Sequence, residues 1–177
     1  MNNLAVCGTI FGMEIQDYKK TYDAATRKVL ELASKIDSFA LDKFDAEYRL
    51  VDIAYVLREK YADPAFRHKY VGNLPFNGFV PWPKGFCALS TICVYELYGG
   101  TDIWTPSAIH LGDWEHAPVV FLRDNENGIA FDATGDQFAP LRVPYEVGTP
   151  INRRMADMRT PNKAEFVRQI KQELDKR

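Results

Sequence analysis

The N-terminal third of the chain repeats apolar side chains at intervals of three and four residues, the period of a helix with one buried face. The repeat runs over residues 14–37 and again over 40–61, and it predicts two amphipathic helices. The two apolar stripes are Ile15, Tyr18, Tyr22, Ala25, Val29, Leu32 and Ile36, and then Leu41, Phe44, Tyr48, Val51 and Tyr55. We expect Asp37-Ser38 to end the first helix and Asp63-Pro64 the second, because the residue before proline disfavours helical backbone. Packing of both helices on a core is the favoured arrangement, with a coiled-coil-like hairpin as the alternative.

A third helix is predicted after the Pro-, Gly- and aromatic-rich loop at 70–86. Apolar residues recur at helical spacing from Leu89 to Tyr95, which indicates one buried face. The glycine pair at 99–100 predicts a left-handed C-terminal cap. Cys87 is therefore expected at or near the helix N-terminus, where unpaired N–H groups and the helix dipole favour negative charge. Such a position can lower the pKa of a thiol and expose a thiolate.

Beyond the glycine pair the hydrophobic period changes from 3.6 to 2, which indicates strands. We expect strands around 107–111, 114–122 and 128–133, with a hairpin turn at 124–128. Residues 139–161 are interrupted by prolines and predicted to be largely irregular. A closing helix is predicted at 162–176, with Ala164, Val167, Ile170 and Leu174 on its apolar face.

These elements predict an α+β fold with N-terminal helices, a central helix bearing the cysteine, and a small antiparallel sheet. The length of 177 residues and the hydrophobic content of 46% fit one core of ordinary size. We expect a single domain over 1–177. Its parts are a helical subdomain at 14–62, a catalytic core at 78–140 and a closing helix at 162–176.

Composition narrows the possible partners and the compartment. A net charge of −2 gives no bulk attraction to nucleic acid or to an anionic membrane. Three cysteines without paired spacing argue against a disulfide framework and suit a reducing compartment. No apolar run reaches the roughly 18 residues of a membrane span. We therefore predict a soluble, cytoplasmic protein that acts without nucleic acid, membrane or cofactor.

A possible catalytic constellation links the predicted helix to the hairpin. His116 and Asp132 lie on either side of the turn, and their midpoint is residue 124. A symmetric hairpin folded there, with an odd loop or one bulge, would bring both side chains to one face. A carboxylate that holds one imidazole nitrogen fixes the tautomer and raises the basicity of the ring, as a cysteine nucleophile requires. Cys87, His116 and Asp132 would then form a triad.

The residues around these positions extend the pattern: Gly85-x-Cys87-Ala88, Gly99-Gly100, His116, and Asp132-Ala-Thr134-Gly-Asp-Gln137-Phe138. In order and context they resemble the papain-like and transglutaminase-like cysteine superfamily. They are similar within it to small bacterial and phage-borne proteins that carry G-x-C, G-G, a His-bearing strand and D-x-T-x-x-Q-F. The resemblance covers about residues 78–140. It implies a papain-like fold with Cys87 as nucleophile, His116 as base and Asp132 as orienter, and it leaves the substrate open.

One position departs from the papain pattern. The oxyanion-donating glutamine that papain-type enzymes place six residues before the cysteine is replaced here by Pro81. The N–H of Cys87 could serve as one donor, with Asn77 or Gln137 as second-donor candidates. The aromatics of the preceding loop, Trp82 among them, could line a substrate groove or fill the gap between the helices and the sheet.

Other readings of single residues stay open. Cys87 could be a small buried hydrophobe, Cys93 is expected in the core, and Cys7 is expected to be structural. His110 could join the triad residues as a zinc ligand, but the ligand spacing does not support a metal site. A basic group formed by Arg153, Arg154, Arg159 and Lys163 could bind an acidic partner, although a solvated face is favoured.

The resulting hypothesis is a cysteine hydrolase or acyl transferase that cleaves an amide bond through a thioester. Its substrate would be a peptide, a protein side-chain amide or a small amide, so that it acts as a peptidase, an amidase or a protein deamidase. One alternative is a non-catalytic binding module on the same fold. Another is a phage or host-directed effector that modifies a host glutamine.

Overall fold

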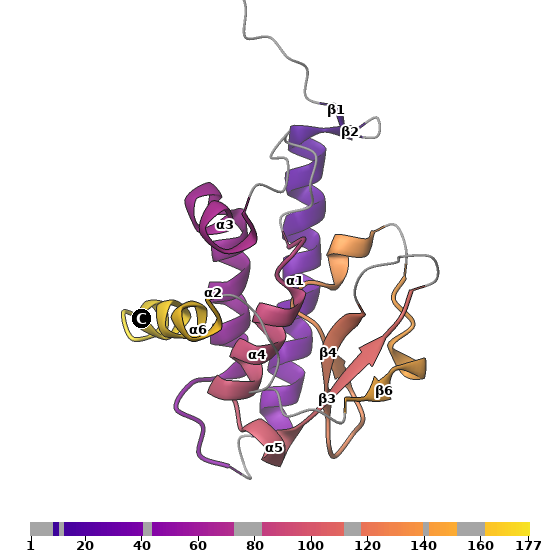
Figure 1. The fold of residues 1–177 in the computed structure, drawn as a ribbon, viewed down its shortest axis with the longest axis vertical. Helices are drawn as coiled ribbons and strands as arrows, with labels where there is room; N and C mark the ends of the chain where they lie inside the picture. The colour runs from indigo at the N-terminus through magenta and orange to yellow at the C-terminus, as the bar shows by residue number, and fades with distance from the viewer. Residues whose placement is uncertain are drawn as a thin grey trace, which may run out of the picture.

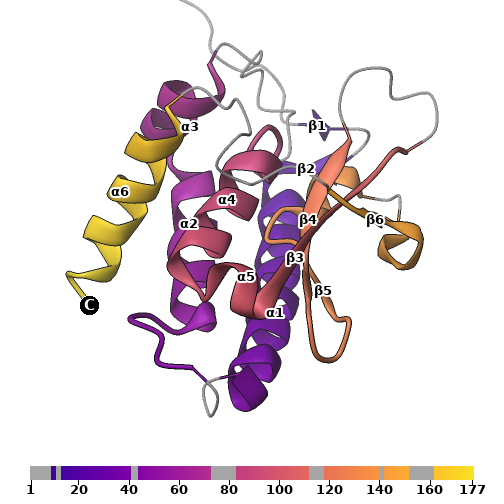
Figure 2. The ribbon, with the colours of Figure 1, turned by 60° about the horizontal axis from the view of Figure 1, so that its bottom comes forward.

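The computed structural model describes residues 9–10, 13–40, 44–72, 83–111, 118–139, 142–151 and 162–177, with side chains from residue 19 onward. Figures 1 and 2 show a helical layer beside a small sheet. The elements are β1 (Thr9–Ile10), β2 (Met13–Glu14), α1 (Ile15–Ala40), α2 (Leu50–Ala62), α3 (Pro64–Val71), α4 (Cys87–Leu97), α5 (Gly100–Ile103), β3 (Trp104–Ile109), β4 (Val119–Asp124), β5 (Ala130–Phe131), the short 3-10 helices η1 (Gly135–Phe138) and η2 (Tyr145–Val147), β6 (Thr149–Pro150) and α6 (Lys163–Leu174). This is the α+β class that the sequence predicted.

The predicted break at Asp37 is wrong, and the residue has a different role. Helix α1 continues to Ala40, and Asp37 is 1% exposed. Its carboxylate accepts hydrogen bonds from the N–H groups of Leu50 (2.9 Å) and Val51 (3.1 Å) and from the hydroxyl of Tyr98 (2.7 Å). Asp37 therefore caps the N-terminus of α2 from a neighbouring helix and satisfies donors that a helix start leaves open.

Helix α2 begins ten residues later than predicted and buries a different face. Its buried residues are Leu50, Ile53, Ala54, Val56, Leu57, Arg58 and Tyr61. Of the predicted stripe, Phe44, Tyr48 and Val51 are half-buried, Tyr55 is 39% exposed, and Leu41 lies outside the described residues. In α1, Tyr22 and Ile36 are buried, and Ala25, Val29 and Leu32 are half-buried, as a helix packed on α2 requires.

Asp63-Pro64 ends α2 as predicted and also starts α3. The Asp63 carboxylate accepts from the N–H groups of Ala65 (2.9 Å) and Phe66 (3.3 Å), and Pro64 occupies the first helical position. Proline is tolerated there because its missing N–H has no partner within the helix. The same dipeptide thus closes one helix and opens the next.

Helix α4 is confirmed in place but is buried on nearly every side rather than on one face. The six consecutive residues from Leu89 to Val94 are all buried. Helices α2 and α6 contact α4 on one side and β4 contacts it on the other, so α4 lies between the helical layer and the sheet (Figure 2). It ends at the predicted glycine pair, where Gly99 has φ +75° and a Cβ would lie 2.3 Å from Cγ1 of Ile103.

The sheet is antiparallel, in the order β5-β4-β3-β6. The predicted turn between β4 and β5 is confirmed, and Asp124 organises it by accepting from the N–H groups of Glu126, Asn127 and Ile129. Leu122 and Phe131 pair across the hairpin and belong to the main core shared with the helices. The opposite face carries a smaller apolar cluster of Ile109, Val119, Phe121, Phe138 and Val143, with Tyr145 packed against it.

The closing helix α6 is confirmed and docks on α2 and α4. Phe166, Ile170 and Leu174 are buried, Val167 is half-buried, and Ala164 is exposed rather than on the packed face. Among the described helices, none combines the length and apolar content needed to cross a membrane.

Candidate active site

Cys87 is the first residue of α4 and is half-buried. One turn further on, the Thr91 hydroxyl bonds to the carbonyls of Cys87 (2.8 Å) and Val120 (3.1 Å), which fixes the start of α4 against β4. Burial and then the charge of Asp132 raise the pKa of the Cys87 thiol, while backbone hydrogen bonds from Val120, Ala88 and Cys87 itself act the other way. The expected lowered pKa is therefore wrong for these surroundings, because desolvation outweighs the helix N-terminus.

The start of α4 is also held from α2. Tyr61 and Ser90 are joined by a buried hydrogen bond between their hydroxyl groups, and Ser90 Oγ donates to the carbonyl of Phe86 at 2.7 Å. The ring of Phe86 stacks on that of Tyr61, with centroids 4.8 Å apart. The backbone immediately before Cys87 is therefore fixed on its helical side.

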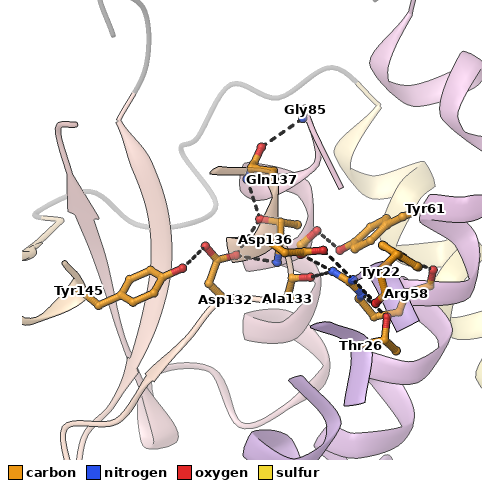
Figure 3. A network of polar contacts seen from close by, with 12 residues as sticks. Tyr22, Thr26, Arg58, Tyr61, Gly85, Asp132, Ala133, Asp136, Gln137 and Tyr145 are labelled. Atoms are coloured by element: carbon orange, nitrogen blue, oxygen red, sulfur yellow. Dashed lines mark hydrogen bonds and ion pairs between the residues drawn. The ribbon is translucent and has the colours of Figure 1, made fainter. Parts of the chain in front are cut away.

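Asp132 follows β5 and accepts three hydrogen bonds. The N–H and the hydroxyl of Thr134 donate to Oδ1 at 2.8 and 2.7 Å, and the hydroxyl of Tyr145 donates to Oδ2 at 2.8 Å (Figure 3). Burial raises the pKa of the Asp132 carboxyl, and the bonds from Thr134 and Tyr145 act against that shift. The structure thus brings the predicted nucleophile and the predicted orienter close enough for the charge of Asp132 to act on the thiol of Cys87.

Gln137 connects the Asp132 segment to the loop before Cys87. Its Nε2 donates to Thr134 Oγ1 at 2.9 Å, and its Oε1 accepts from the N–H of Gly85 at 3.4 Å (Figure 3). Both ends of the Gln137 carboxamide therefore have hydrogen-bond partners. The side chain links the D-x-T-x-x-Q segment to the G-x-C segment. The donor role suggested for it stays a prediction.

A charged residue that sequence reasoning missed supports this segment from α2. The Arg58 guanidinium is 1% exposed and bonds to both carboxylate oxygens of Asp136 and to the carbonyl of Ala133 (Figure 3). Its Nε donates to Thr26, and the group lies 4.0 Å from the centroid of the Tyr22 ring. Helical spacing could have indicated that Arg58 is buried, because residue 58 falls on the same helical stripe as buried residues 54 and 61.

The hairpin register differs from the one used to predict the triad. Leu122 pairs with Phe131 and Arg123 with Ala130, so the hairpin is centred between residues 126 and 127 rather than at 124. Extended by one position, this register sets Asp132 against Phe121 instead of His116. The argument from hairpin symmetry is therefore wrong, and pairing of His116 with Asp132 rests on the resemblance and on the chemistry of the carboxylate. His116 itself, with Asn77, Trp82 and Cys7, lies outside the described residues.

The remaining candidates are simpler to place. Cys93 is fully buried in the main core, as predicted. His110 is exposed just after β3. Of the basic group, only Lys163 is described, and its Nζ lies 3.6 Å from Oε1 of Glu96. Within the described part of the chain, no group of three or more His, Cys, Asp or Glu side chains is arranged to hold a metal ion.

Comparison with known proteins adds no relative. The chain matches no known protein family, no curated protein and no solved structure. The resemblance to the papain-like and transglutaminase-like superfamily therefore stays a prediction, carried by the residues themselves.

Proposed function

We propose that this chain is a papain-like cysteine enzyme that acts on an amide bond through a thioester, with Cys87 as nucleophile, His116 as base and Asp132 as orienter. The observation that carries the proposal is the convergence of two distant segments. Cys87 begins the central helix beside β4, the Asp132 carboxylate acts on its thiol, and the Gln137–Gly85 hydrogen bond ties the segments together. In a cysteine triad an imidazole lies between the thiol and the carboxylate, so a carboxylate whose charge acts on a helix-borne thiol supports the proposal.

In the proposed reaction, the imidazole of His116 takes the proton of the Cys87 thiol as sulfur attacks the amide carbon. The resulting oxyanion is stabilised by the backbone N–H of Cys87 at the start of α4. Collapse of this intermediate breaks the carbon–nitrogen bond, and the imidazolium gives its proton to the leaving amine. Water or an acceptor amine then attacks the thioester, which releases the acyl group and restores the thiol.

Electrostatics around the two described residues supports an imidazolium between them. Burial raises the pKa of both the Cys87 thiol and the Asp132 carboxyl, so a negative charge on either is disfavoured. One cation placed between them would offset both penalties at once. Oδ2 of Asp132 accepts one hydrogen bond among the described side chains, from Tyr145, and a carboxylate oxygen can accept a second.

The raised pKa of Cys87 also favours a second candidate, a non-catalytic binding module on the same fold. In that case Cys87 is a small, half-buried packing side chain, and Asp132 serves only to hold its loop through Thr134 and Tyr145. The two candidates differ in what happens when the charge of Asp132 is removed.

The discriminating experiment is the rate of Cys87 alkylation by iodoacetamide as a function of pH, in the wild type and in Asp132→Asn. Mass spectrometry assigns the label to Cys87, and Cys87→Ala gives the background. In the triad, loss of the carboxylate destabilises the imidazolium, so the profile moves to higher pH. Without an imidazolium, loss of the charge that raises the thiol pKa moves the profile to lower pH. Asp102→Asn, at an exposed position on α5, is the matched control.

A shift to lower pH, or superimposable profiles, would contradict the proposed enzyme and favour the binding module. If the profile shifts to higher pH, peptide, glutamine-side-chain and small-amide substrates can be screened for turnover that Cys87→Ala abolishes.

A further inference from the structure

Tyr145 reaches the candidate site from the face of the sheet opposite the helices. It begins η2, and its ring packs edge-on against Phe121, with centroids 4.9 Å apart. Arg123 on β4 donates to the carbonyl of Tyr145 at 2.6 Å. Both the ring and the backbone of Tyr145 are therefore anchored on β4, and the hydroxyl points at Asp132 (Figure 3).

The hydroxyl of Tyr145 is a permanent donor to Asp132. Burial and the charge of Asp132 raise the pKa of Tyr145, so the phenol keeps its proton over the whole neutral range. The two oxygens of the carboxylate have different partners, because Thr134 holds Oδ1 from within the same turn and Tyr145 holds Oδ2 from another element. Removal of the Tyr145 hydroxyl would leave Oδ2 without the hydrogen bond that η2 supplies.

Gly135 leaves the space in which this hydroxyl lies. A Cβ at position 135 would be 2.5 Å from the hydroxyl oxygen of Tyr145 and 3.7 Å from Oδ2 of Asp132. Gly135 is not among the residues with positive φ, so its backbone accepts alanine. Alanine at this position would therefore displace the phenol tip without removing any polar group.

We propose that Tyr145 is a positioning residue for the chemistry of Cys87: its hydroxyl fixes Oδ2 of the Asp132 carboxylate, in a space that Gly135 leaves open. The inference rests on the proposed function, since it gives Tyr145 a role that acts through Asp132. Loss of the Tyr145 bond raises the pH at which Asp132 ionises, which weakens its hold on an imidazolium at lower pH.

The test compares Tyr145→Phe, Gly135→Ala and Asp132→Asn by site-resolved alkylation of Cys87 against pH. We expect Tyr145→Phe and Gly135→Ala to move the profile in the direction of Asp132→Asn but less far. The rate between about pH 6 and 7 should fall about threefold to tenfold, the equivalent of up to about one pKa unit. Tyr48→Phe is the matched control, because Tyr48 also donates to a carboxylate, but to that of Asp175 at the end of α6 rather than to that of Asp132.

The outcomes separate this inference from the proposed function. A Tyr145→Phe profile that superimposes on the wild type, while Asp132→Asn shifts upward, overturns the role of Tyr145 and leaves the triad intact. No upward shift in Asp132→Asn overturns both. A thermal melt of each variant shows whether it folds. If Gly135→Ala does not fold, Tyr145→Phe, which removes one oxygen atom, carries the decision alone.

Discussion

Arg58 of α2 and Asp136 of η1 form a two-point ion pair, with Nη1 2.6 Å from Oδ1 and Nη2 2.9 Å from Oδ2. Nη1 also donates to the carbonyl of Ala133 at 3.0 Å. The guanidinium is 1% exposed, so the pair is largely shielded from solvent on the arginine side. This contact joins the helical layer to the segment that carries Asp132.

Removal of one partner of this pair should be strongly destabilising. Asp136→Asn leaves the buried guanidinium without a counter-charge, and we expect a loss of about 3 to 5 kcal/mol in the free energy of unfolding. Chemical denaturation measures the loss. Glu165→Gln, which removes a carboxylate from the exposed pairs with Lys69 and Arg168, is the control and should have a much smaller effect, because solvent screens exposed pairs. Equal losses in the two variants would mean that Arg58 finds other compensation.

Asp37 provides a second buried polar contact with a large predicted effect. Asp37→Ala removes a carboxylate that accepts three hydrogen bonds, and it leaves the N–H groups of Leu50 and Val51 without their cap. We expect a cost of about 2 to 4 kcal/mol, above the usual value for an exposed cap because the site is buried. Ser38→Ala, at the neighbouring exposed position, should stay within about 0.5 kcal/mol. A shift of the denaturation midpoint no larger than that of Ser38→Ala would contradict the capping role.

Local patterns were sufficient to predict much of the fold. Helical spacing placed α4 and α6, the glycine pair placed the end of α4, and turn residues placed the hairpin between β4 and β5. What failed was the choice of buried face. Apolar residues occur on more than one side of α2, so periodicity selected Tyr55, which is partly exposed, and passed over Arg58. A charged side chain is buried only where tertiary partners neutralise it, and spacing along one helix does not reveal Asp136.

The candidate site shows the same limit. The sequence placed Cys87 at a helix start and pointed to Asp132 as the expected orienter. In the structure Cys87 begins α4, and the charge of Asp132 acts on its thiol. The direction of the thiol pKa could not be predicted, because desolvation depends on the layers packed around α4. The contact of Tyr145 with Asp132 was also missed, since Tyr145 comes from a segment expected to be irregular. The hairpin register differs from the predicted one because Asp124 accepts hydrogen bonds from the turn backbone and thereby fixes where the turn begins.

The packing of α1 gives a graded prediction. Ala33 is fully buried, and Val29 is half-buried against the same core. Ala33→Asp should therefore cost several kcal/mol, about 3 or more, whereas Val29→Asp should cost about 1 to 3 kcal/mol, because its carboxylate can turn toward water. Ser34→Asp, at an exposed position, is the control. A Val29→Asp variant with an unchanged melting temperature would mean that this part of α1 is a free surface.

The last prediction concerns α6, whose buried face is flanked by exposed ion pairs. Lys171 of α6 lies 2.8 Å from the carboxylate of Glu47, and Lys69 of α3 lies 3.0 Å from that of Glu165. Hydrogen bonds from Lys171 lower the pKa of Glu47, and those from Arg168 and then Lys69 lower the pKa of Glu165. A lowered folded-state pKa means that the folded chain binds fewer protons than the unfolded chain. The contribution of these pairs is then complete above the unfolded pKa and is lost as the pH falls through the folded value.

We therefore expect the double variant Glu47→Gln/Glu165→Gln to lose less stability on acidification than the wild type. The measurement is the free energy of unfolding of both proteins at about pH 7 and about pH 3.5, above and below the unfolded glutamate pKa of about 4.3. Near neutral pH the variant should be the less stable of the two, and the difference should shrink at acid pH, as protonation begins to remove the same charges from the wild type. High salt should also shrink it, because exposed pairs are screened. Glu31→Gln, at an exposed position on α1, is the control for loss of a surface carboxylate. A difference that stays constant between the two pH values would show that these pairs contribute nothing to the docking of α6.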